Sequence, residues 1–266
     1  LKELISKQKS NNVSATILTS MQEVPDGYGR VFCNNNDWVE EIIEHSDCND
    51  IQKKNQLTNA GVYCFNWEEL KNILPKLKTN NKQNEIYLTD AIKELKSVMQ
   101  YKVSEQEEVI GINDRIQLHQ CEVIVQKRLR DKFMKQGVTF IDAESCTLSE
   151  DCSFGIDVVV EPQTRIKGSC KFGSNCRLGP NTFLEDVNIG EDVSIIYSFV
   201  KQANISEGVC IGPYSHIRPN TEISPNCKIG NFVEVKKSRL GQGTKVNHLS
   251  YIGDSTLGNN VNIGAG

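Results

Sequence analysis

A hydrophobic repeat in residues 148–266 constrains the fold more than any other feature of the sequence. An aliphatic residue or Phe returns every sixth position and occasionally every fifth, whereas helices and strands have periods of 3.6 and 2. A step of six fits a parallel β-helix in which each short strand and its turn use six residues and three steps close one coil. We therefore expect triangular coils with 21 side chains inside: Leu148, Phe154, Val160, Ile166, Phe172, Leu178, Leu184, Ile189, Ile195, Val200, Ile205, Ile211, Ile217, Ile223, Ile229, Val235, Leu240, Val246, Ile252, Leu257 and Ile263.

A second inward slot lies four positions later and usually holds a small or β-branched residue. Four of the ten cysteines occupy it, and the sequence contains no CxxC motif. We expect these thiols to be reduced and structural, since buried Cys behaves as a small hydrophobe. The four are Cys152, Cys170, Cys176 and Cys227.

Glycine directly follows the recurring residue in many steps. We expect these glycines to supply unusual φ angles at tight corners. They are Gly155, Gly173, Gly179, Gly190, Gly212, Gly230, Gly241, Gly253, Gly258 and Gly264.

The residues before the repeat alternate strand and helix signals, which is typical of an α/β sheet. A long helix is predicted over 115–136, with Gly137 at its C′ position and one apolar stripe formed by Leu118, Cys121, Val125, Leu129 and Phe133. Thr89-Asp90 is suited to capping the N-terminus of a helix predicted over 89–99. We expect helices over 2–9, 67–77 and 89–99, and strands over 14–21, 31–33 and 61–65.

Three parts follow from these patterns: an α/β part at 1–114, a linker helix at 115–137 and a repeat part at 138–266. The chain starts at Leu1 rather than Met and stops at Gly266 within a repeat, without a polar capping coil. Since solenoids normally carry caps, we expect a fragment of a longer protein, with sequence missing on both sides.

Composition excludes some classes of protein. With 38% hydrophobic and 24% charged residues, the 266-residue chain can bury a core. The net charge of −4 argues against a general nucleic-acid surface. No apolar run approaches the roughly 18 residues of a membrane span, so we expect no membrane partner and a cytoplasmic location.

Four residues of the α/β part are candidates for ligand binding because they fall at strand edges and loops, where such sheets bind ligands. Each has a simpler alternative: Gly29 as a turn glycine, Glu44 and Asn59 as surface or capping groups, and Asn113 as a helix N-cap.

In the repeat, Arg218 and Lys236 each follow an inward residue and are 18 positions apart. Three steps of six should stack them on one face, one coil apart, where two cations suit a phosphate. His248 and Tyr251 fall in the next coil, and His titrates near working pH, so His248 is a candidate base. Solvated surface charges are the simpler alternative, and a zinc site would need three His where the repeat has only His216 and His248.

Seven motifs occur in an order that carries a resemblance. They are 28–30 (YGR), 43–45 (IEH), 59–63 (NAGVY), 85–90 (EIYLTD), 111–115 (GINDR), 231–236 (NFVEVK) and 248–254 (HLSYIGD). Together they resemble the bacterial bifunctional UDP-N-acetylglucosamine pyrophosphorylase/glucosamine-1-phosphate N-acetyltransferase family over nearly the whole chain.

The resemblance implies a partial Rossmann-like nucleotidyltransferase domain, a linker helix, a left-handed β-helix of hexapeptide repeats and a homotrimer. In the first part it implies that Gly29, Glu44 and Asn59 surround N-acetylglucosamine, and that Asn113 contacts the nucleotide and Mg²⁺. Ser46 departs from the family pattern, which often has Lys there.

In the repeat, the resemblance implies the residues of an acetyltransferase site. It puts Arg218 and Lys236 on the sugar phosphate, with His248 as general base. It also puts Tyr251 and Asn262 on the sugar, and Ala265 at acetyl-CoA. Asn220 departs from the pattern, which usually has Gly.

The function implied is acetyl transfer from acetyl-CoA to glucosamine 1-phosphate, followed by uridylyl transfer from UTP with release of pyrophosphate. This supplies UDP-N-acetylglucosamine for envelope polysaccharides. Two alternatives stay open: a nucleotidyltransferase for another sugar 1-phosphate whose β-helix only oligomerises, or a non-catalytic trimerisation fragment.

Overall fold

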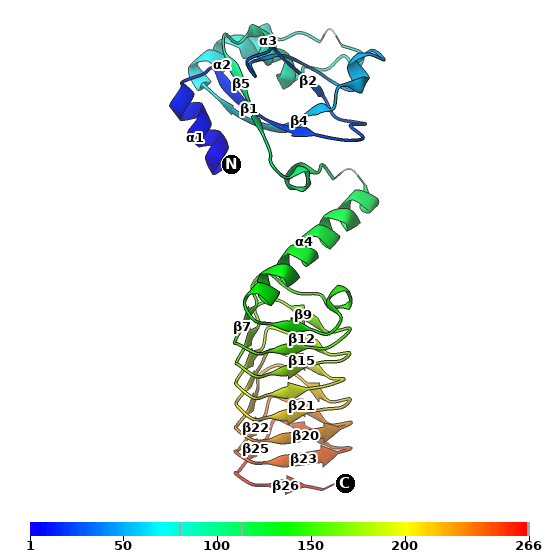
Figure 1. Cartoon of the computed structure of the whole chain (residues 1–266). Coiled ribbons are helices and arrows are strands. Elements are labelled where there is room, and N and C mark those ends of the chain that lie inside the picture. The colour runs from blue at the N-terminus through cyan, green and yellow to red at the C-terminus, as the bar shows by residue number, and fades with distance from the viewer. Residues whose placement is uncertain (80, 113, 265–266) are drawn as a thin grey trace. The chain divides into compact units, whose positions relative to one another are not determined.

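The computed structural model describes residues 1–79, 81–112 and 114–264. The chain forms two compact units, Leu1–Cys121 and Glu122–Gly266 (Figure 1). None of the helices within the described residues is long and apolar enough to cross a membrane.

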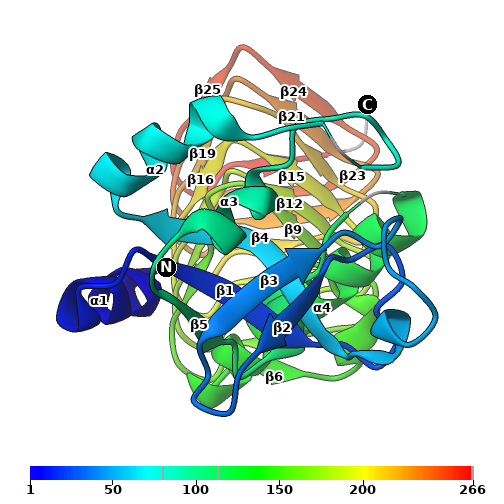
Figure 2. The same ribbon diagram turned by 90° about the horizontal axis from the view of Figure 1, so that it is seen from above.

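The first unit is built on a five-stranded sheet in the order β3-β2-β4-β1-β5 (Figure 2). β1 pairs in parallel with β5. The other pairs, β1 with β4, β2 with β3 and β2 with β4, are antiparallel. Aliphatic residues of the strands and of two short helices form its core. The elements are α1 (Lys2–Asn11), β1 (Ala15–Met21), β2 (Arg30–Cys33), β3 (Val39–Ile43), β4 (Leu57–Phe65), α2 (Trp67–Ile73), α3 (Ala91–Glu94) and β5 (Val98–Lys102).

The prediction of a helix over 89–99 is wrong beyond Glu94. The helical stretch is limited to α3, and Val98 begins β5, which pairs with β1. Ser97 helps to fix the register of β5 against β1, since its hydroxyl accepts from the Ser14 backbone N–H at 3.0 Å. Thr89 does not cap the helix, because its hydroxyl donates to Glu44 Oε1 at 2.9 Å. A neighbouring strand therefore overrides local helix propensity.

Other boundaries differ less from expectation. β4 is longer than the predicted strand, and β3, which was not predicted, completes the hairpin with β2. α2 stops at Ile73 and a single 3₁₀ turn with Pro75 follows it, since proline does not continue an α-helix.

The long helix α4 (Arg115–Lys135) ends as predicted. Gly137 has φ +97°, and its N–H and that of Val138 bond the carbonyls of Met134 and Phe133, which closes the helix end. Phe133 is buried in the solenoid core, but Leu118 and Val125 are exposed. The predicted apolar stripe thus packs only near its C-terminal end.

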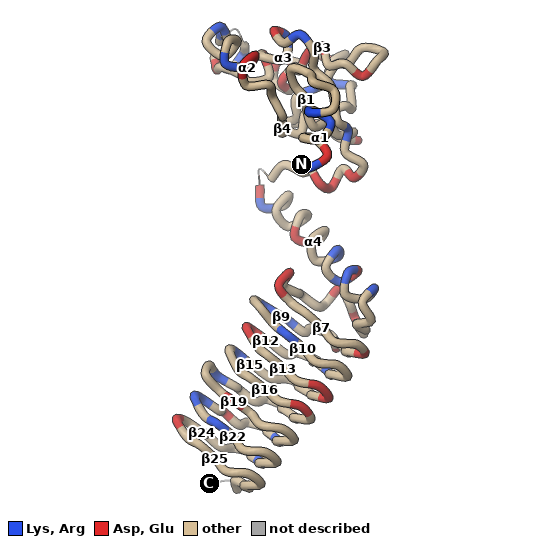
Figure 3. Tube along the Cα trace, turned by 90° about the vertical axis from the view of Figure 1, so that its left-hand side faces the viewer, with Lys and Arg blue, Asp and Glu red and all other residues tan. Residues whose placement is uncertain are grey.

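The second unit is a parallel solenoid whose strands fall into three sheets, with consecutive strands assigned to different sheets (Figures 1 and 3). Paired residues are 16–18 positions apart in successive coils, except for β6 and β8, whose paired residues are 20 apart. One sheet, the seven-stranded sheet, holds β7 (Ser153–Phe154), β10 (Lys171–Phe172), β13 (Asn188–Ile189), β16 (Ala203–Ile205), β19 (Thr221–Ile223), β22 (Arg239–Leu240) and β25 (Thr256–Leu257).

The eight-stranded sheet holds β6 (Thr139–Phe140), β8 (Val159–Val160), β11 (Arg177–Leu178), β14 (Ser194–Ile195), β17 (Cys210–Ile211), β20 (Lys228–Asn231), β23 (Lys245–His248) and β26 (Asn262–Ile263). The six-stranded sheet holds β9 (Arg165–Lys167), β12 (Phe183–Glu185), β15 (Phe199–Lys201), β18 (His216–Ile217), β21 (Glu234–Lys236) and β24 (Tyr251–Gly253).

The predicted core is confirmed. Of the 21 recurring residues 18 are buried, and Phe154, Leu257 and Ile263 are partly buried against the same core. The four cysteines of the small slot are buried as free thiols.

The reason expected for the repeat glycines is wrong for most of them. Of the ten, Gly179 and Gly212 have positive φ. A Cβ on Gly173 would instead lie 2.5 Å from the backbone of Gly190 in the next coil, and one on Gly190 would lie 2.7 Å from the Glu207 nitrogen. These glycines therefore allow the coils to approach closely, while Asn, Asp and a few larger residues supply most of the left-handed corners.

We predict that Gly173→Ala lowers the free energy of unfolding by about 1–3 kcal/mol, because the added methyl group meets backbone that cannot move away. Gly258→Ala is the matched control, since its Cβ would meet only the Val261 side chain at 4.0 Å. Urea unfolding followed by circular dichroism measures both, and equal stabilities of the two variants would contradict the close-approach argument.

Candidate functional site

In the first unit, Gly29, Glu44 and Asn59 lie together, although Gly29 precedes β2, Glu44 follows β3 and Asn59 belongs to β4. The Asn59 backbone N–H donates to the Gly29 carbonyl at 2.9 Å. A Cβ at Gly29 would lie 3.2 Å from Glu44 Oε2 and 3.3 Å from the Ile42 side chain, so glycine leaves room for the carboxylate. The β2–β3 and β2–β4 pairings bring these three residues together.

Two further residues orient this cluster. Glu44 Oε1 accepts from the Thr89 hydroxyl, and the Asn59 amide nitrogen donates to the Tyr63 hydroxyl at 2.6 Å. The Asn59 amide oxygen accepts from the Gly61 N–H at 3.1 Å. One carboxylate oxygen and part of the amide's bonding capacity remain for a ligand. Thr89 and Tyr63 both fall within the quoted motifs, but only the fold shows what they bond.

Two predicted residues, Asn113 and Ala265, lie outside the described residues. Asp114, which follows Asn113, accepts from the Gln117 N–H at 2.8 Å. Among the described residues, no group of three or more His, Cys, Asp or Glu is arranged to hold a metal ion.

The two departures from the family pattern have local structural contexts. Asn220 has φ +62°, a left-handed conformation that Asn tolerates nearly as well as Gly. The Ser46 carbonyl accepts from the Lys82 ammonium, so a cation contacts this segment from another part of the unit.

On the solenoid, the predicted stacking of the two cations is confirmed. Ile217 pairs with Val235, so Arg218 and Lys236 follow on the outer face of adjacent strands. Both side chains are half-buried. The sheet register therefore brings two positive charges to neighbouring positions on one face.

Carboxylates accompany both cations, which the sequence reasoning missed. Arg218 Nη1 pairs with Glu234 Oε1 at 2.7 Å, and Lys236 Nζ lies 3.9 Å from Asp254 Oδ2. The hydrogen bond and charge of Lys237, together with Lys236, lower the pKa of the Asp254 carboxyl. Glu234 lies in the quoted motif 231–236, two residues before Lys236. Its position next to the inward Val235 indicated that its side chain faces outward on the same side as Lys236.

His248 and Tyr251 lie on either side of one solenoid corner. His248 ends β23, is exposed and pairs with Asn231. Tyr251 begins β24 and pairs with Glu234 one coil earlier. The Tyr251 ring lies over Gly253, because a Cβ there would be 2.5 Å from its hydroxyl oxygen. Gly253 itself pairs with Lys236, so the phenol lies on the side of the sheet that carries Lys236.

Asn262 lies one coil beyond this corner. It pairs with Lys245 on the eight-stranded sheet, and its amide oxygen accepts from the Asn247 amide at 3.2 Å. Arg218, Lys236, His248, Tyr251 and Asn262 thus fall on consecutive coils, with Arg218 and Lys236 further along the six-stranded sheet and His248 and Tyr251 at one edge of the solenoid.

The same edge carries exposed bulky residues in left-handed conformations. Tyr197, Tyr214, Phe232 and Leu249, here called the aromatic corner, have φ of +45° to +58° and are 39–62% exposed. The corresponding residues at the other two edges are Asn, Asp, Gly, Gln or Lys. A left-handed conformation costs roughly 1–2 kcal/mol for a residue with a side chain.

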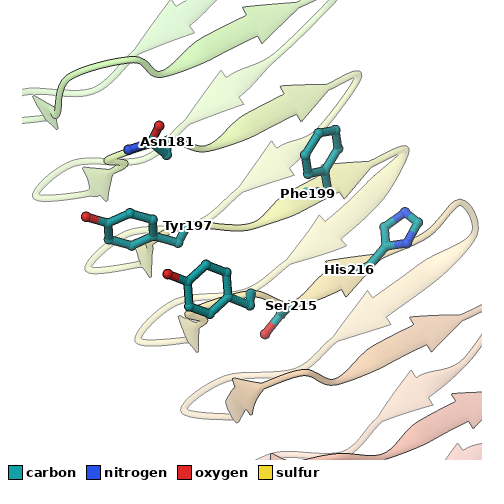
Figure 4. A pocket seen from close by; sticks show the side chains of 6 residues that line it. Asn181, Tyr197, Phe199, Ser215 and His216 are labelled. Atoms are coloured by element: carbon teal, nitrogen blue, oxygen red, sulfur yellow. The ribbon is translucent and has the colours of Figure 1, made fainter.

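A groove runs beside the aromatic corner on the six-stranded sheet. Asn181, Tyr197, Phe199, Tyr214, Ser215 and His216 line it (Figure 4). Tyr214 stacks on Phe232 at 5.5 Å between ring centroids, and the edge of His216 meets Phe199 at 6.3 Å. This surface is apolar, and the aromatic corner beside it continues to Leu249, the neighbour of His248.

The fold and these clusters define an α/β unit joined in one chain to a hexapeptide-type parallel solenoid, which carries two cations on one outer face and a histidine at the edge of that face. The chain is 55% identical over all 266 residues to "Bifunctional protein GlmU" of Synechococcus sp. (strain CC9311), and 55% identical to that of Prochlorococcus marinus (strain MIT 9211). It is 46% identical to the GlmU protein of Rippkaea orientalis. The resemblance to the bifunctional family is therefore confirmed along the whole chain.

The chain spans 59% of the length of each of these three curated relatives. The family model of the GMPPB C-terminal domain matches residues 199–266. A solved structure from Bacillus cereus aligns with 44% of this chain and 74% of its own, at 11% identity and a TM-score of 0.29, a similarity too low to bear on fold or function.

The Asn59–Tyr63 contact can be checked by titration. Burial raises the pKa of the Tyr63 phenol above its ordinary value of 10.0, and the Asn59 hydrogen bond opposes the rise by stabilising the phenolate. Asn59→Ala should therefore raise the pKa further. Ultraviolet titration with Tyr63→Phe as the subtraction control measures it, and an unchanged or lower pKa would contradict the contact.

Proposed function

We propose that the complete protein makes UDP-N-acetylglucosamine in two steps. The solenoid transfers acetyl from acetyl-CoA to glucosamine 1-phosphate, and the α/β part then transfers uridylyl from UTP to the product, with release of pyrophosphate. Identity of 55% along the whole chain to proteins named bifunctional carries this proposal. The position of Arg218, Lys236 and Tyr251 along the six-stranded sheet, with His248 at its edge, supports it.

We assign the finer architecture in the same way. The solenoid is a left-handed β-helix of hexapeptide repeats at 138–266, the linker helix covers 115–137, and 1–114 is part of a Rossmann-like uridylyltransferase domain. We place the reactions in the cytoplasm.

In the acetyl transfer, Arg218 and Lys236 bind the sugar phosphate. Arg218 gives one of its five donors to Glu234, so its other N–H groups remain available. His248 removes a proton from the substrate ammonium, and the freed nitrogen attacks the thioester carbonyl. The new C–N bond replaces the C–S bond, and coenzyme A leaves as its thiol. Tyr251 and Asn262 bond the sugar, and Ala265 contacts acetyl-CoA.

In the uridylyl transfer, Gly29, Glu44 and Asn59 hold the N-acetylglucosamine. Mg²⁺ supplies charge neutralisation on the phosphates when bound. The amide oxygen of Asn113 suits this cation as one oxygen ligand, and another part of the complete protein supplies the carboxylate.

Two substitutions separate the activities in a full-length version that carries the segments present in the curated relatives. His248→Ala should lower the acetyl-transfer kcat by about 10²–10⁴-fold and spare uridylyl transfer. Its melting temperature should hardly change, because His248 is exposed. Asn113→Ala should lower uridylyl transfer and spare acetyl transfer. Wild-type acetyl transfer by His248→Ala from pH 6 to 9 would remove it as the base.

We also propose that copies of the chain associate as a homotrimer through the aromatic corner. Bulky side chains in left-handed conformations are retained in water only where something compensates their strain, and a second copy would cover them. The corner continues directly into His248, so association would also shield the acetyl-transfer site from water.

Tyr214→Asn tests this association. Asn adopts the left-handed conformation more readily than Tyr, so a weaker assembly could not be ascribed to a more strained coil. Sedimentation velocity should show a shift from trimer to smaller species, while Asp192→Asn at another edge should sediment as wild type. A Tyr214→Asn variant with the wild-type mass would contradict a role for the aromatic corner.

A further inference from the structure

The first unit contains a fully buried arginine that the proposed reaction does not use. Arg30 is 0% exposed and begins β2, the strand between β3 and β4. Its backbone pairs with Ile43 on one side and Thr58 on the other. These are the residues immediately before Glu44 and Asn59.

The side chain of Arg30 contacts three separate segments. Nη1 donates to the Tyr28 carbonyl, and Nη2 lies 3.5 Å from both His45 Nδ1 and the Lys53 carbonyl. A guanidinium can only donate, so Nδ1 of His45 accepts and its ring proton is on Nε2. The contacts join the residue before Gly29, the residue after Glu44 and the loop that leads to β4.

The charge of Arg30 is poorly compensated. No carboxylate in the described part of the chain lies within ion-pair distance of it, and its Nε has no hydrogen-bond partner. A buried charge without a counterion costs several kcal/mol, and an apolar residue of similar volume is often neutral or stabilising in its place. Stability alone therefore does not explain an arginine here.

We propose that Arg30 is a positioning residue for uridylyl transfer, which holds Gly29 and Glu44 in register through the Tyr28 carbonyl and the His45 ring. This inference rests on the proposed function of the first unit. Glu44 is bonded from one side by Thr89, and the Arg30–His45 contact fixes the backbone that follows it.

Arg30→Met in the full-length protein separates positioning from stability. The unbranched apolar chain follows Arg as far as Nε but makes none of its hydrogen bonds. We expect kcat/KM for uridylyl transfer to fall on the order of 10²-fold, mainly through a higher KM for N-acetylglucosamine 1-phosphate. The melting temperature should stay the same or rise, and acetyl transfer should be unaffected. Lys96→Met, which removes an exposed cation from the same unit, should leave both activities unchanged.

His45 provides a second test that does not depend on how Arg30→Met folds. His45→Asn places an amide oxygen near the position of Nδ1, whereas His45→Gln places its amide nearer Nε2. The loss in kcat/KM should therefore be smaller for Asn than for Gln.

Three results would overturn the inference. One is wild-type uridylyl transfer by a folded Arg30→Met protein, and another is a loss that follows the melting temperature across all the variants. The third is equal losses for the two His45 variants. A wild-type protein without uridylyl transfer would instead refute the proposed function itself.

Discussion

The close stacking of successive coils is the constraint on which the rest of the solenoid depends. Inward residues such as Ile217 and Val235 are buried only while each coil lies directly on the next. Gly173 and Gly190 permit this, because a side chain at either would meet the backbone of the following coil. The same stacking sets the register of the outer face. The inferred phosphate residues are thus positioned by the core beneath them.

Charge on the outer face is balanced between coils as well as along them. Glu161 pairs with Arg177, and Glu185 with both Lys167 and Lys201, and charged residues recur from coil to coil in Figure 3. Exposed pairs of this kind contribute little stability each. Around the inferred phosphate residues they have a second consequence, since Glu234 already orients Arg218 and Asp254 lies 3.9 Å from Lys236 before a phosphate binds.

Local sequence predicted some elements correctly. It failed for elements whose secondary structure depends on pairing with a segment far away in the sequence. The end of α4 at Gly137 was predictable because helix closure depends on a few neighbouring residues. The strand that begins at Val98 was predicted as helix, since its outcome depends on Ala15, which is 83 positions away. For the same reason Thr89 was predicted as a helix cap, whereas its hydroxyl bonds Glu44.

The sequence by itself determined the solenoid, its inward residues and the stacking of Arg218 on Lys236, because a six-residue hydrophobic period is a local property that one packing satisfies. Only the tertiary structure decided that Glu234 pairs with Arg218 and that Tyr251 lies over Gly253. It alone also placed Arg30 between the segments that carry Glu44 and Asn59. These contacts join side chains whose separation depends on the coil spacing and the strand order, and no local pattern encodes either.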